Sequence, residues 1–366
     1  MLKNFKKQLS FYFFALITGF SAFAQDPQFS MFYSVPLYLN PAFTGGRHAN
    51  RALVHQRWQW PSQEAKFYTT QLSFDTYVNK YNSGFGVLAL QDYQGGDNLT
   101  STYLSFNYAY ELPLTRNKTL RFGLQGGLIQ RSAGALSLRS DLSNDGATGG
   151  KSFGGRNILL PDIGAGVIFY DRNLFAGITL NHINRPRDAY FGSALMPVKL
   201  TIVGGYKIPI PLTGGSIKSK GLHGAPDYLY LTPTFTYKHQ GGTDSEYIGP
   251  GADQLDIGLY LTRKFFIAGI WYRGLPLKQY KSTDVTQASN YDAMVFLVGV
   301  NYNGIGFGYS YDYTISKQQN VRTGGAHEVN LTYVFRTSKK KTIQRTLPCP
   351  DFETDILQKA GSGVGK

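Results

Sequence analysis

The sequence contains a single cysteine, Cys349, among its 366 residues. One cysteine cannot form an internal disulfide, so the chain is not one of the secreted folds that disulfide bonds hold together. The six histidines and this cysteine do not cluster at the spacing of a zinc site. We therefore expect no metal and no cofactor. Cys349 lies between two prolines, and pairing with another chain and an unpaired thiol packed against the protein are alternatives that both stay open.

Long apolar runs are also scarce. The one clear run, residues 11–24, has 14 residues, whereas a membrane-spanning helix needs about 20. It follows a lysine-rich segment and ends in Ala22-Phe23-Ala24, the small-x-small pattern that signal peptidase recognises. This predicts a cleaved signal peptide over residues 1–24, with Gln25 as the first mature residue, rather than a membrane anchor. Since no later run approaches spanning length, a helical membrane protein is excluded.

Acidic residues are few. The chain has 23 Asp and Glu and 37 Lys and Arg, which gives a net charge of +14. The signal peptide removes three lysines and no acid, which leaves +11. A nucleic-acid-binding protein would gather this charge in one patch with stacking aromatics, but here it is scattered, so no nucleic-acid partner is expected. The exception is the stretch around Lys339-Lys340-Lys341. It predicts a solvated end after the last strand, with contact to anionic lipid or an acidic partner as the alternative.

Aromatic residues and glycine are abundant, at 15% of the chain and 42 copies respectively. From about residue 51, segments of some ten residues alternate between apolar and polar side chains, and turn-forming residues separate them. In the clearest segment, Val329, Leu331, Tyr333 and Phe335 share one face and polar residues share the other. Such alternation is typical of strands with one face in lipid and one in a polar lumen, although a soluble β-sandwich would alternate too.

The number and spacing of the segments distinguish these two folds. Fourteen strands are predicted, and an even number is required of a single-chain barrel with both ends in the periplasm. Tight turns alternate with long loops such as 131–160 and 275–291, as periplasmic turns and outer loops do in outer-membrane barrels. The connection 209–227 is an exception, since it is long on the side of the turns. The predicted strands are 51–60, 66–75, 82–91, 99–111, 119–130, 161–170, 173–182, 198–208, 228–239, 253–262, 264–274, 292–301, 304–313 and 326–335.

We therefore predict an all-β protein, a transmembrane outer-membrane antiparallel β-barrel of about 14 strands. The barrel is expected over residues 51–336. A Pro- and aromatic-rich segment, 25–50, precedes it, and a periplasmic tail, 337–366, follows it.

Charged residues at polar positions of several strands are candidates for the inside of this barrel. Because buried polar groups must be paired or hydrated, we expect them to form a hydrogen-bonded network, and packing is favoured over a transport pathway for Arg57 and Arg121. None belongs to a hydrolase motif or to a pair of carboxylates, so no catalytic site is expected and the chain is predicted not to be an enzyme. The candidates for the lumen network are Arg57, Arg121, Asp162, Asp256, Arg273 and Asp312.

The segment ahead of the first strand has the most specific pattern. Its prolines make a regular helix or a central strand unfavourable. It reads Asp26-Pro27-Gln28-Phe29-Ser30 and then Pro36-Leu37-Tyr38-Leu39-Asn40-Pro41-Ala42-Phe43. These residues resemble the opening of the PorP/SprF family of type IX secretion system outer-membrane proteins. The family usually has Asn where this chain has Val35 and Tyr near Phe43, which are small departures.

The likeness continues along the whole mature chain as many short matches in the same order, which together are more specific than any one of them. The matches include Arg57-Trp58-Gln59-Trp60-Pro61, Leu120-Arg121-Phe122-Gly123-Leu124-Gln125, Asn181-His182-Ile183-Asn184-Arg185-Pro186 and Gly324-Gly325-Ala326-His327-Glu328.

The resemblance implies an accessory barrel that helps a large type IX substrate, often a gliding or surface adhesin, to reach the cell surface and stay there. The substrate's C-terminal domain is the implied partner, and components of the periplasmic secretion machinery are implied partners of some members. The alternative is a general diffusion or ligand-uptake channel, which requires a lumen that is not plugged.

Two sets of residues are expected to contact other proteins: one the client, and one the barrel-insertion machinery. Partner contact is expected on the long loops 131–160 and 275–291. In the first, basic side chains could steer an encounter and aromatic area could hold it. Tyr333 and Phe335 resemble the C-terminal signal that the barrel-insertion machinery reads. The candidate contact residues are Arg131, Arg139, Lys151, Phe153 and Arg156.

Overall fold

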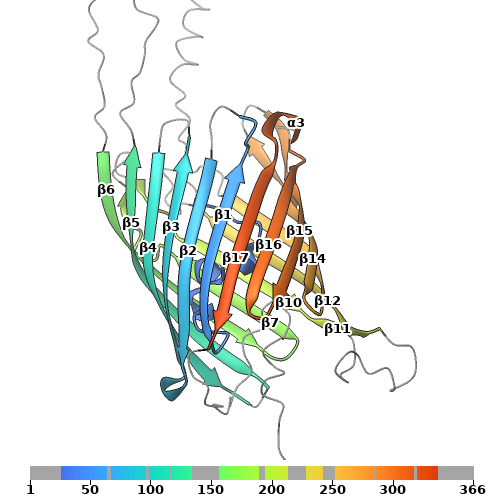
Figure 1. Ribbon diagram of the computed structural model, residues 1–366. Coiled ribbons are helices and arrows are strands. Elements are labelled where there is room, and N and C mark those ends of the chain that lie inside the picture. The colour runs from blue at the N-terminus through green and yellow to red at the C-terminus, as the bar shows by residue number, and fades with distance from the viewer. Residues whose placement is uncertain are drawn as a thin grey trace, which may run out of the picture.

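The computed structural model describes residues 26–336 except 64–66, 96–98, 116, 134–155, 189–193, 213–227, 242–251, 283–284 and 317–319. Over these residues an antiparallel sheet closes into a barrel of 14 strands, which confirms the predicted fold (Figure 1). The barrel strands are β1 (Asn50–Gln59), β2 (Phe67–Val78), β3 (Ser83–Gln94), β4 (Leu99–Pro113), β5 (Thr119–Ala133), β6 (Arg156–Tyr170), β7 (Leu174–Asn181), β10 (Lys199–Tyr206), β12 (Tyr228–Gln240), β13 (Ala252–Arg263), β14 (Phe266–Ser282), β15 (Val285–Tyr302), β16 (Ile305–Thr314) and β17 (Ala326–Phe335).

The barrel closes where the first strand meets the last. β1 and β17 are antiparallel, with Asn50 opposite Phe335 and Gln59 opposite Ala326. Each other barrel strand pairs with the barrel strands before and after it, so the closed ring leaves no edge without a partner. Two short pairings lie outside this ring: β11 (Ile208–Pro211) extends the ladder along the start of β12, and β8 (Arg187–Asp188) forms a hairpin with β9 (Ala194–Leu195).

The two ends of the barrel differ in their connections. At the turn end, β1 begins, β17 ends and most connections are short; the opposite end is called the loop end. Asn82, Asn303 and Gly304 adopt positive φ at the turn end, as tight hairpins require. The Asp171 carboxylate accepts hydrogen bonds from the N–H groups of Asn173 and Leu174, both at 2.8 Å. The predicted alternation of turns and loops is therefore observed, and β11 occupies the start of the exceptional connection.

Side chains alternate across the wall of the barrel as predicted. In β4, Leu104, Phe106 and Tyr108 are exposed on the outside, whereas Ser105 and Asn107 between them are buried. The outer surface is apolar on strand after strand, which suits lipid. The inner surface combines many buried polar side chains with apolar ones such as Leu88 and Trp271. Among the described residues, no helix combines the length and the apolar character needed to cross a membrane.

The stretch 275–291 corrects one prediction, because it is the end of a hairpin and not a loop. β14 continues to Ser282 and β15 begins at Val285, and the two strands stay paired through three register shifts. The neighbours β13 and β16 pair with this hairpin only as far as Arg273 and Ala293, so the ribbon extends beyond them. The sequence pattern predicts the end of a strand at Gly274. The register shift between Arg273 and Gly274 lets the strand continue past it.

Candidate functional site: a filled lumen

Residues 26–49, hereafter the plug, lie inside the barrel and lead into β1 at the turn end (Figure 1). The plug contains three short turns of helix, η1 (Phe32–Ser34), α2 (Pro36–Leu39) and η2 (Pro41–Phe43). Pro36 and Pro41 stand at the start of α2 and η2, where proline loses no hydrogen bond and its fixed φ favours the helix. The side chain of Asn40 caps η2 by accepting from the Ala42 N–H at 2.8 Å. Prolines that exclude one long helix thus allow several short ones.

Apolar side chains of the plug pack against opposite sides of the lumen. Phe29, Val35 and Leu37 are buried among residues of β3, β4, β5 and β6, which include Leu88, Leu90, Tyr103, Ile129 and Leu160. Met31, Phe32 and Leu39 are buried in a second cluster that includes residues of β13, β14 and β15. The rings of Phe32 and Trp271 meet edge to face, with centroids 4.7 Å apart. The plug therefore spans the lumen from wall to wall.

Glycines on the inner face of the wall admit the backbone of the plug. A Cβ on Gly123 would lie 2.1 Å from the Ala42 nitrogen, and one on Gly84 would lie 2.0 Å from the Thr44 carbonyl oxygen. Both distances are far below van der Waals contact, so a side chain at either position would displace the plug. Close approach of another backbone is a recognised reason for glycine in a strand.

Toward the loop end, the Glu328 carboxylate of β17 binds the plug backbone. Its oxygens accept hydrogen bonds from the N–H groups of Ser30 at 2.7 Å and Met31 at 2.8 Å. Arg57, directly opposite Glu328 in the register of β1 and β17, donates to the same carboxylate. His55 Nε2 lies 3.2 Å from it. Glu328 is fully buried, so these contacts form where an unpaired charge would be costly.

The Ser30 hydroxyl binds three of the predicted lumen residues directly and a fourth, Asp256, through Arg273. It accepts from Arg57 at 2.8 Å and from Arg273 at 2.6 Å, and it donates to Asp312 at 2.5 Å. Arg273 also donates to Asp312 at 3.0 Å and to Asp256 at 3.3 Å. We call this set, together with Glu328, the loop-end cluster. Arginine suits such a centre, because its fork of donors can serve several acceptors at once.

A second contact holds the first residue of the plug. His182, just after β7, lies between two carboxylates, with Nε2 2.9 Å from Asp26 and Nδ1 2.7 Å from Asp162. Lys199 Nζ is 3.0 Å from Asp26 as well. Because carboxylates only accept hydrogen bonds, both ring nitrogens of His182 must donate, which describes an imidazolium. These four residues form the His182 latch.

The electrostatics of the His182 latch follow from this geometry. Burial lowers the pKa of His182, but Asp26 and Asp162 outweigh it and raise the pKa from 6.5 to about 9. Burial alone would raise the pKa of Asp26, yet His182 and Lys199 hold it well below its usual range. Both groups are therefore charged at neutral pH, and their attraction fixes the plug residue nearest the loop end.

At the turn end, Arg121 of β5 donates to the carbonyl oxygens of Ala42, at 2.9 Å, and of Thr44. Its other partner is the buried carboxylate of Glu111, which His48 Nε2 approaches at 2.8 Å. Nearby, the Gly45 N–H donates to Asp75 at 2.7 Å. We call Arg121, Glu111, His48 and Asp75 the turn-end cluster. Here the wall binds plug carbonyl groups through Arg121 as well as a plug N–H group through Asp75, whereas Glu328 binds N–H groups alone.

The six predicted lumen residues are all buried, and they fall into three groups. Arg57, Asp256, Arg273 and Asp312 meet in the loop-end cluster, Asp162 belongs to the His182 latch and Arg121 belongs to the turn-end cluster. Sequence reasoning missed Glu328 and Glu111 as members. Alternation did place Glu328 on the inner face, but nothing in the sequence indicated that plug N–H groups would bind it.

The predicted partner-contact residues lie mostly outside the described residues, as Arg139, Lys151 and Phe153 do. Arg156 begins β6, and its side chain is also outside that description. Arg131, near the end of β5, is 2% exposed, and Tyr103 is its hydrogen-bonding neighbour in the lumen. The contact surface on loop 131–160 therefore stays a prediction. Arg131 itself faces the lumen in the structure.

Tyr333 and Phe335 face outward at the end of β17. Tyr333 is 50% exposed, and its ring stacks on that of Phe335 with centroids 5.1 Å apart. Thr332, the residue before Tyr333, is buried toward the lumen. These positions match the assigned faces, while the role of both rings in membrane insertion stays a prediction.

The site is chemically a set of ion pairs and hydrogen bonds that hold a segment in place. Among the residues that the structure describes, no group of three or more His, Cys, Asp and Glu could hold a metal ion. Each carboxylate of the loop-end cluster faces arginine, and those arginines already have acceptors.

Comparison with known proteins identifies the family of the chain. The family model of the type IX secretion system membrane protein PorP/SprF matches residues 21–333, which confirms the resemblance seen in the sequence. No curated protein sequence matches the chain. Among solved structures, Omp33, an outer membrane protein of Acinetobacter baumannii, is 9% identical, with a TM-score of 0.39 over 80% of this chain and 100% of that one. BamA from Haemophilus ducreyi lacking POTRA domains 1–3 is 11% identical, with a TM-score of 0.37 over 79% and 71%.

Proposed function

Because the chain belongs to the PorP/SprF family of type IX secretion system membrane proteins and folds as an outer-membrane β-barrel, we propose that it is a secretion accessory with a specific client. The client is a large surface protein, an adhesin or gliding-type substrate, recognised through its C-terminal domain. The barrel helps this client to leave the cell and to stay on the surface. A cleaved signal peptide over residues 1–24 exports the chain.

The filled lumen is the observation that favours this role over the channel. A diffusion channel of this size needs an open interior, whereas plug residues contact both sides of the lumen and close the path with buried apolar and charged groups. Holding a segment in place in this way yields a rigid barrel that can present its ends to partners. Contact at the surface, rather than passage through the lumen, is the function that such a barrel supports.

The client contact is proposed on the connection 134–155 at the loop end. A folded domain needs about 800 Å² on each partner, and this is the longest connection between barrel strands. Its basic residues Arg139 and Lys151 beside Phe153 offer charge to steer an encounter and aromatic area to hold it. The hairpin at 275–291 is a second candidate, since its ribbon extends beyond the neighbouring strands. Contacts with periplasmic secretion components are assigned to the turn end.

Loop replacement in cells tests the proposal. Residues 141–155 are exchanged for a short Gly-Ser linker, and residues 242–251, another loop-end connection, are exchanged in a control strain. We expect normal barrel yield in both strains and release of one large client into the medium only in the first. Deletion of the whole chain should remove that client and leave other type IX substrates secreted.

The opposite outcomes are equally specific. A client that stays attached at normal levels after the 141–155 exchange would move the contact elsewhere. If deletion instead slows the uptake of a solute and leaves every surface protein in place, the chain is a channel. Conductance of the purified barrel in a planar bilayer would support that second reading.

A further inference from the structure

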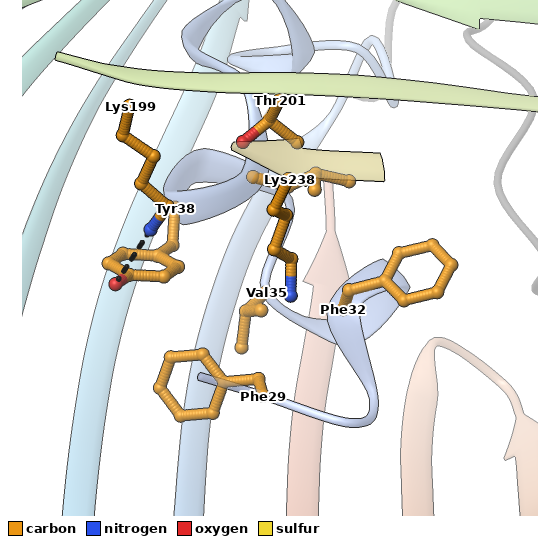
Figure 2. Close-up of a pocket in the computed structure, with 8 residues that line it drawn as sticks. Phe29, Phe32, Val35, Tyr38, Lys199, Thr201 and Lys238 are labelled. Atoms are coloured by element: carbon orange, nitrogen blue, oxygen red, sulfur yellow. Dashed lines mark hydrogen bonds between the residues drawn. The ribbon is translucent and has the colours of Figure 1, made fainter. Parts of the chain in front are cut away.

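The lumen leaves little room for a ligand. A cavity between the plug and the wall strands β10 and β12 has a volume of about 20 Å³ (Figure 2), and one water molecule needs roughly 10–15 Å³. Figure 2 shows the side chains of Lys199 and Lys238 reaching into this space from the wall. The cavity therefore takes a water molecule and nothing larger, whereas the outside of the wall offers an extended surface.

The outer wall shows where the lipid-facing band ends toward the loop end. On β5 the outward side chains over residues 120–128 are apolar or glycine, and on β4 those over residues 104–112 are apolar or aromatic. Each run covers nine residues, the length that a tilted strand needs to cross a membrane. The next outward residues toward the loop end are Gln130 and Thr102, which lie directly opposite each other. The hydrocarbon layer therefore ends below these two residues.

Beyond this edge, β1, β2 and β3, which lie side by side in Figure 1, carry two rows of uncharged side chains on the outer face. Within each row the three residues are directly opposite one another in the strand register. Gln91 of the lower row is also opposite Thr102 of β4, so this row continues the edge of the apolar band. We call the two rows the outer platform; the lower row is Gln56, Thr70 and Gln91, and the upper row is Trp58, Tyr68 and Tyr93.

The side chains of the outer platform are arranged as a flat surface of rings above hydrogen-bonding groups. Trp58 is 44% exposed, and the rings of Tyr68 and Tyr93 stack with centroids 4.6 Å apart. Below them, the Thr70 hydroxyl donates to Gln56 Oε1 at 2.5 Å. Neighbouring strands are about 4.8 Å apart and alternate residues about 7 Å apart, so the platform measures about 10 Å by 7 Å.

The order of the two rows differs from that of an ordinary aromatic belt. In membrane proteins such belts lie directly on the edge of the apolar band, whereas here a row of amides and a hydroxyl separates the rings from it. Trp58, Tyr68 and Tyr93 therefore stand above the acyl chains, in the layer of the lipid head groups.

We propose that the outer platform binds the sugar head group of an outer-leaflet glycolipid. Sugar rings present C–H groups that pack on the negative faces of aromatic rings. Their hydroxyl groups both donate and accept hydrogen bonds, as the amides and the hydroxyl of the lower row do. None of the six side chains is charged, so an uncharged sugar matches the platform better than a phosphate, which favours arginine or lysine.

The position of the outer platform identifies a lipid as the source of the sugar. The loop end is the outer end of the barrel, because outer-membrane barrels keep their short turns in the periplasm. Directly below the lower row, Val54 and Leu72 are opposite each other and exposed. The acyl chains of the same molecule can therefore continue over the apolar wall while its sugar lies on the platform.

Binding is measured by native mass spectrometry of the full-length barrel in lauryldimethylamine oxide, a detergent without sugar. The probes are rough-type lipopolysaccharide with and without its phosphates, and the phosphate-free oligosaccharide released from its acyl chains. Trp58→Leu removes the largest ring of the platform. Tyr302→Leu is the matched control, since Tyr302 is an outward aromatic residue at the turn end and is 62% exposed. Phosphatidylethanolamine serves as a competitor without sugar, and heat-modifiability on gels checks that each variant has folded.

We expect the wild type and Tyr302→Leu to bind the phosphate-free glycolipid equally, and Trp58→Leu to bind it about fivefold more weakly, as the loss of one aromatic contact implies. The released oligosaccharide should bind roughly tenfold more weakly than the intact glycolipid, because it buries no acyl chain. Phosphatidylethanolamine should not displace the glycolipid.

The proposal is overturned if Trp58→Leu binds as well as the wild type, if removal of the phosphates abolishes binding, or if phosphatidylethanolamine displaces the probe. An oligosaccharide that binds as tightly as the intact glycolipid would reject a lipid as the source. Should Trp58→Leu fail to fold, the wild type is cross-linked to glycolipid with a diazirine on its sugar. Cross-links to β1, β2 or β3 support the platform, and cross-links confined to other strands refute it. None of these results depends on the identity of the secretion client.

Discussion

The two ends of the plug are held in different ways. At the turn end, the wall presents Arg121 to plug carbonyl groups, and the plug backbone rests on glycines before it continues into β1. At the loop end, the wall presents the Glu328 carboxylate to plug N–H groups, and charged side chains make the remaining contacts. The turn end is thus fixed by shape and covalent continuity in addition to its charged contacts, whereas the loop end depends on charged contacts without that continuity. Removal of one charged partner, or a change of pH, should therefore release only the loop end.

The largest effect is expected from Glu328→Gln. Removing one member of a buried ion pair costs about 3–5 kcal/mol, because the remaining charge loses its partner. Arg57 keeps Asp312, but the Ser30 and Met31 N–H groups lose a charged acceptor. We expect a lower midpoint of urea unfolding and a plug whose first residues detach from the wall.

Glu111→Gln is the matched variant for the turn end, because Glu111 is also fully buried and paired with an arginine. Detachment is followed by thiol labelling of Gln28→Cys, a partly exposed plug position, in a Cys349→Ser background. Both glutamine variants should lose stability, yet only Glu328→Gln should label faster. Equal labelling of the two would show that the ends are not independent.

The next effect tests shape at the turn end. Gly123→Ala places a Cβ 2.1 Å from the Ala42 nitrogen and 2.3 Å from the Pro41 carbonyl carbon. Overpacking of this kind costs about 3 kcal/mol, at the upper end of its range, because both contacts are backbone atoms. Gly126→Ala on the same strand is the control, since its Cβ would meet nothing within 4 Å. Heat-modifiability on gels should separate the two variants, and equal melting would mean that the plug is not seated against Gly123.

These glycines also show what sequence reasoning could and could not reach. Alternation located all 14 barrel strands, because lipid on one side and a polar lumen on the other impose a period of two on each of them. It could not locate the plug, since a segment of short proline-started turns has no such period. Gly84 and Gly123 were a usable signal, as glycine at inner positions of a strand indicates close approach of another backbone.

The lumen network was predicted as a set of residues but not as an arrangement. Burial of Arg57 and Asp312 follows from strand patterning, whereas their meeting at Ser30 depends on where the plug runs. Alternation predicts the correct face for Glu328. Its contact with plug N–H groups, however, also depends on where the plug runs. The hairpin at 275–291 was missed for a different reason: its register shifts break the alternation by which strands are recognised.

The third prediction concerns pH and the His182 latch. Since the pKa of His182 is raised from 6.5 to about 9, its contribution to stability is complete below pH 6.5 and is lost as pH rises through 9. Between pH 7.5 and 10 this amounts to about 2 kcal/mol. The contact of Asp26 with Lys199 Nζ, at 3.0 Å, does not involve the imidazole. The urea midpoint of the wild type should fall over this range more steeply than that of His182→Gln, and parallel curves would exclude His182 as the titrating group.

The smallest effect is expected from Ser30→Ala, and it separates side-chain from backbone contributions at the loop end. The hydroxyl accepts from Arg57 and Arg273 and donates to Asp312, but both arginines keep carboxylate partners without it. The N–H of residue 30 still binds Glu328, so the loss should be about 1 kcal/mol, the usual net value of one hydrogen bond.

Thr69→Val provides the control for Ser30→Ala. It removes another buried hydroxyl that donates to a carboxylate, Asp92, at 2.6 Å, but both of those residues belong to the wall. The two variants should lose similar stability, while only Ser30→Ala should raise the labelling rate of Cys at position 28, by a few-fold. If Thr69→Val raises it as much, labelling reports general loosening of the barrel and not release of the plug. If neither variant raises it, the Ser30 hydroxyl does not hold the plug, and the contrast between the two ends rests on Glu328 and the His182 latch.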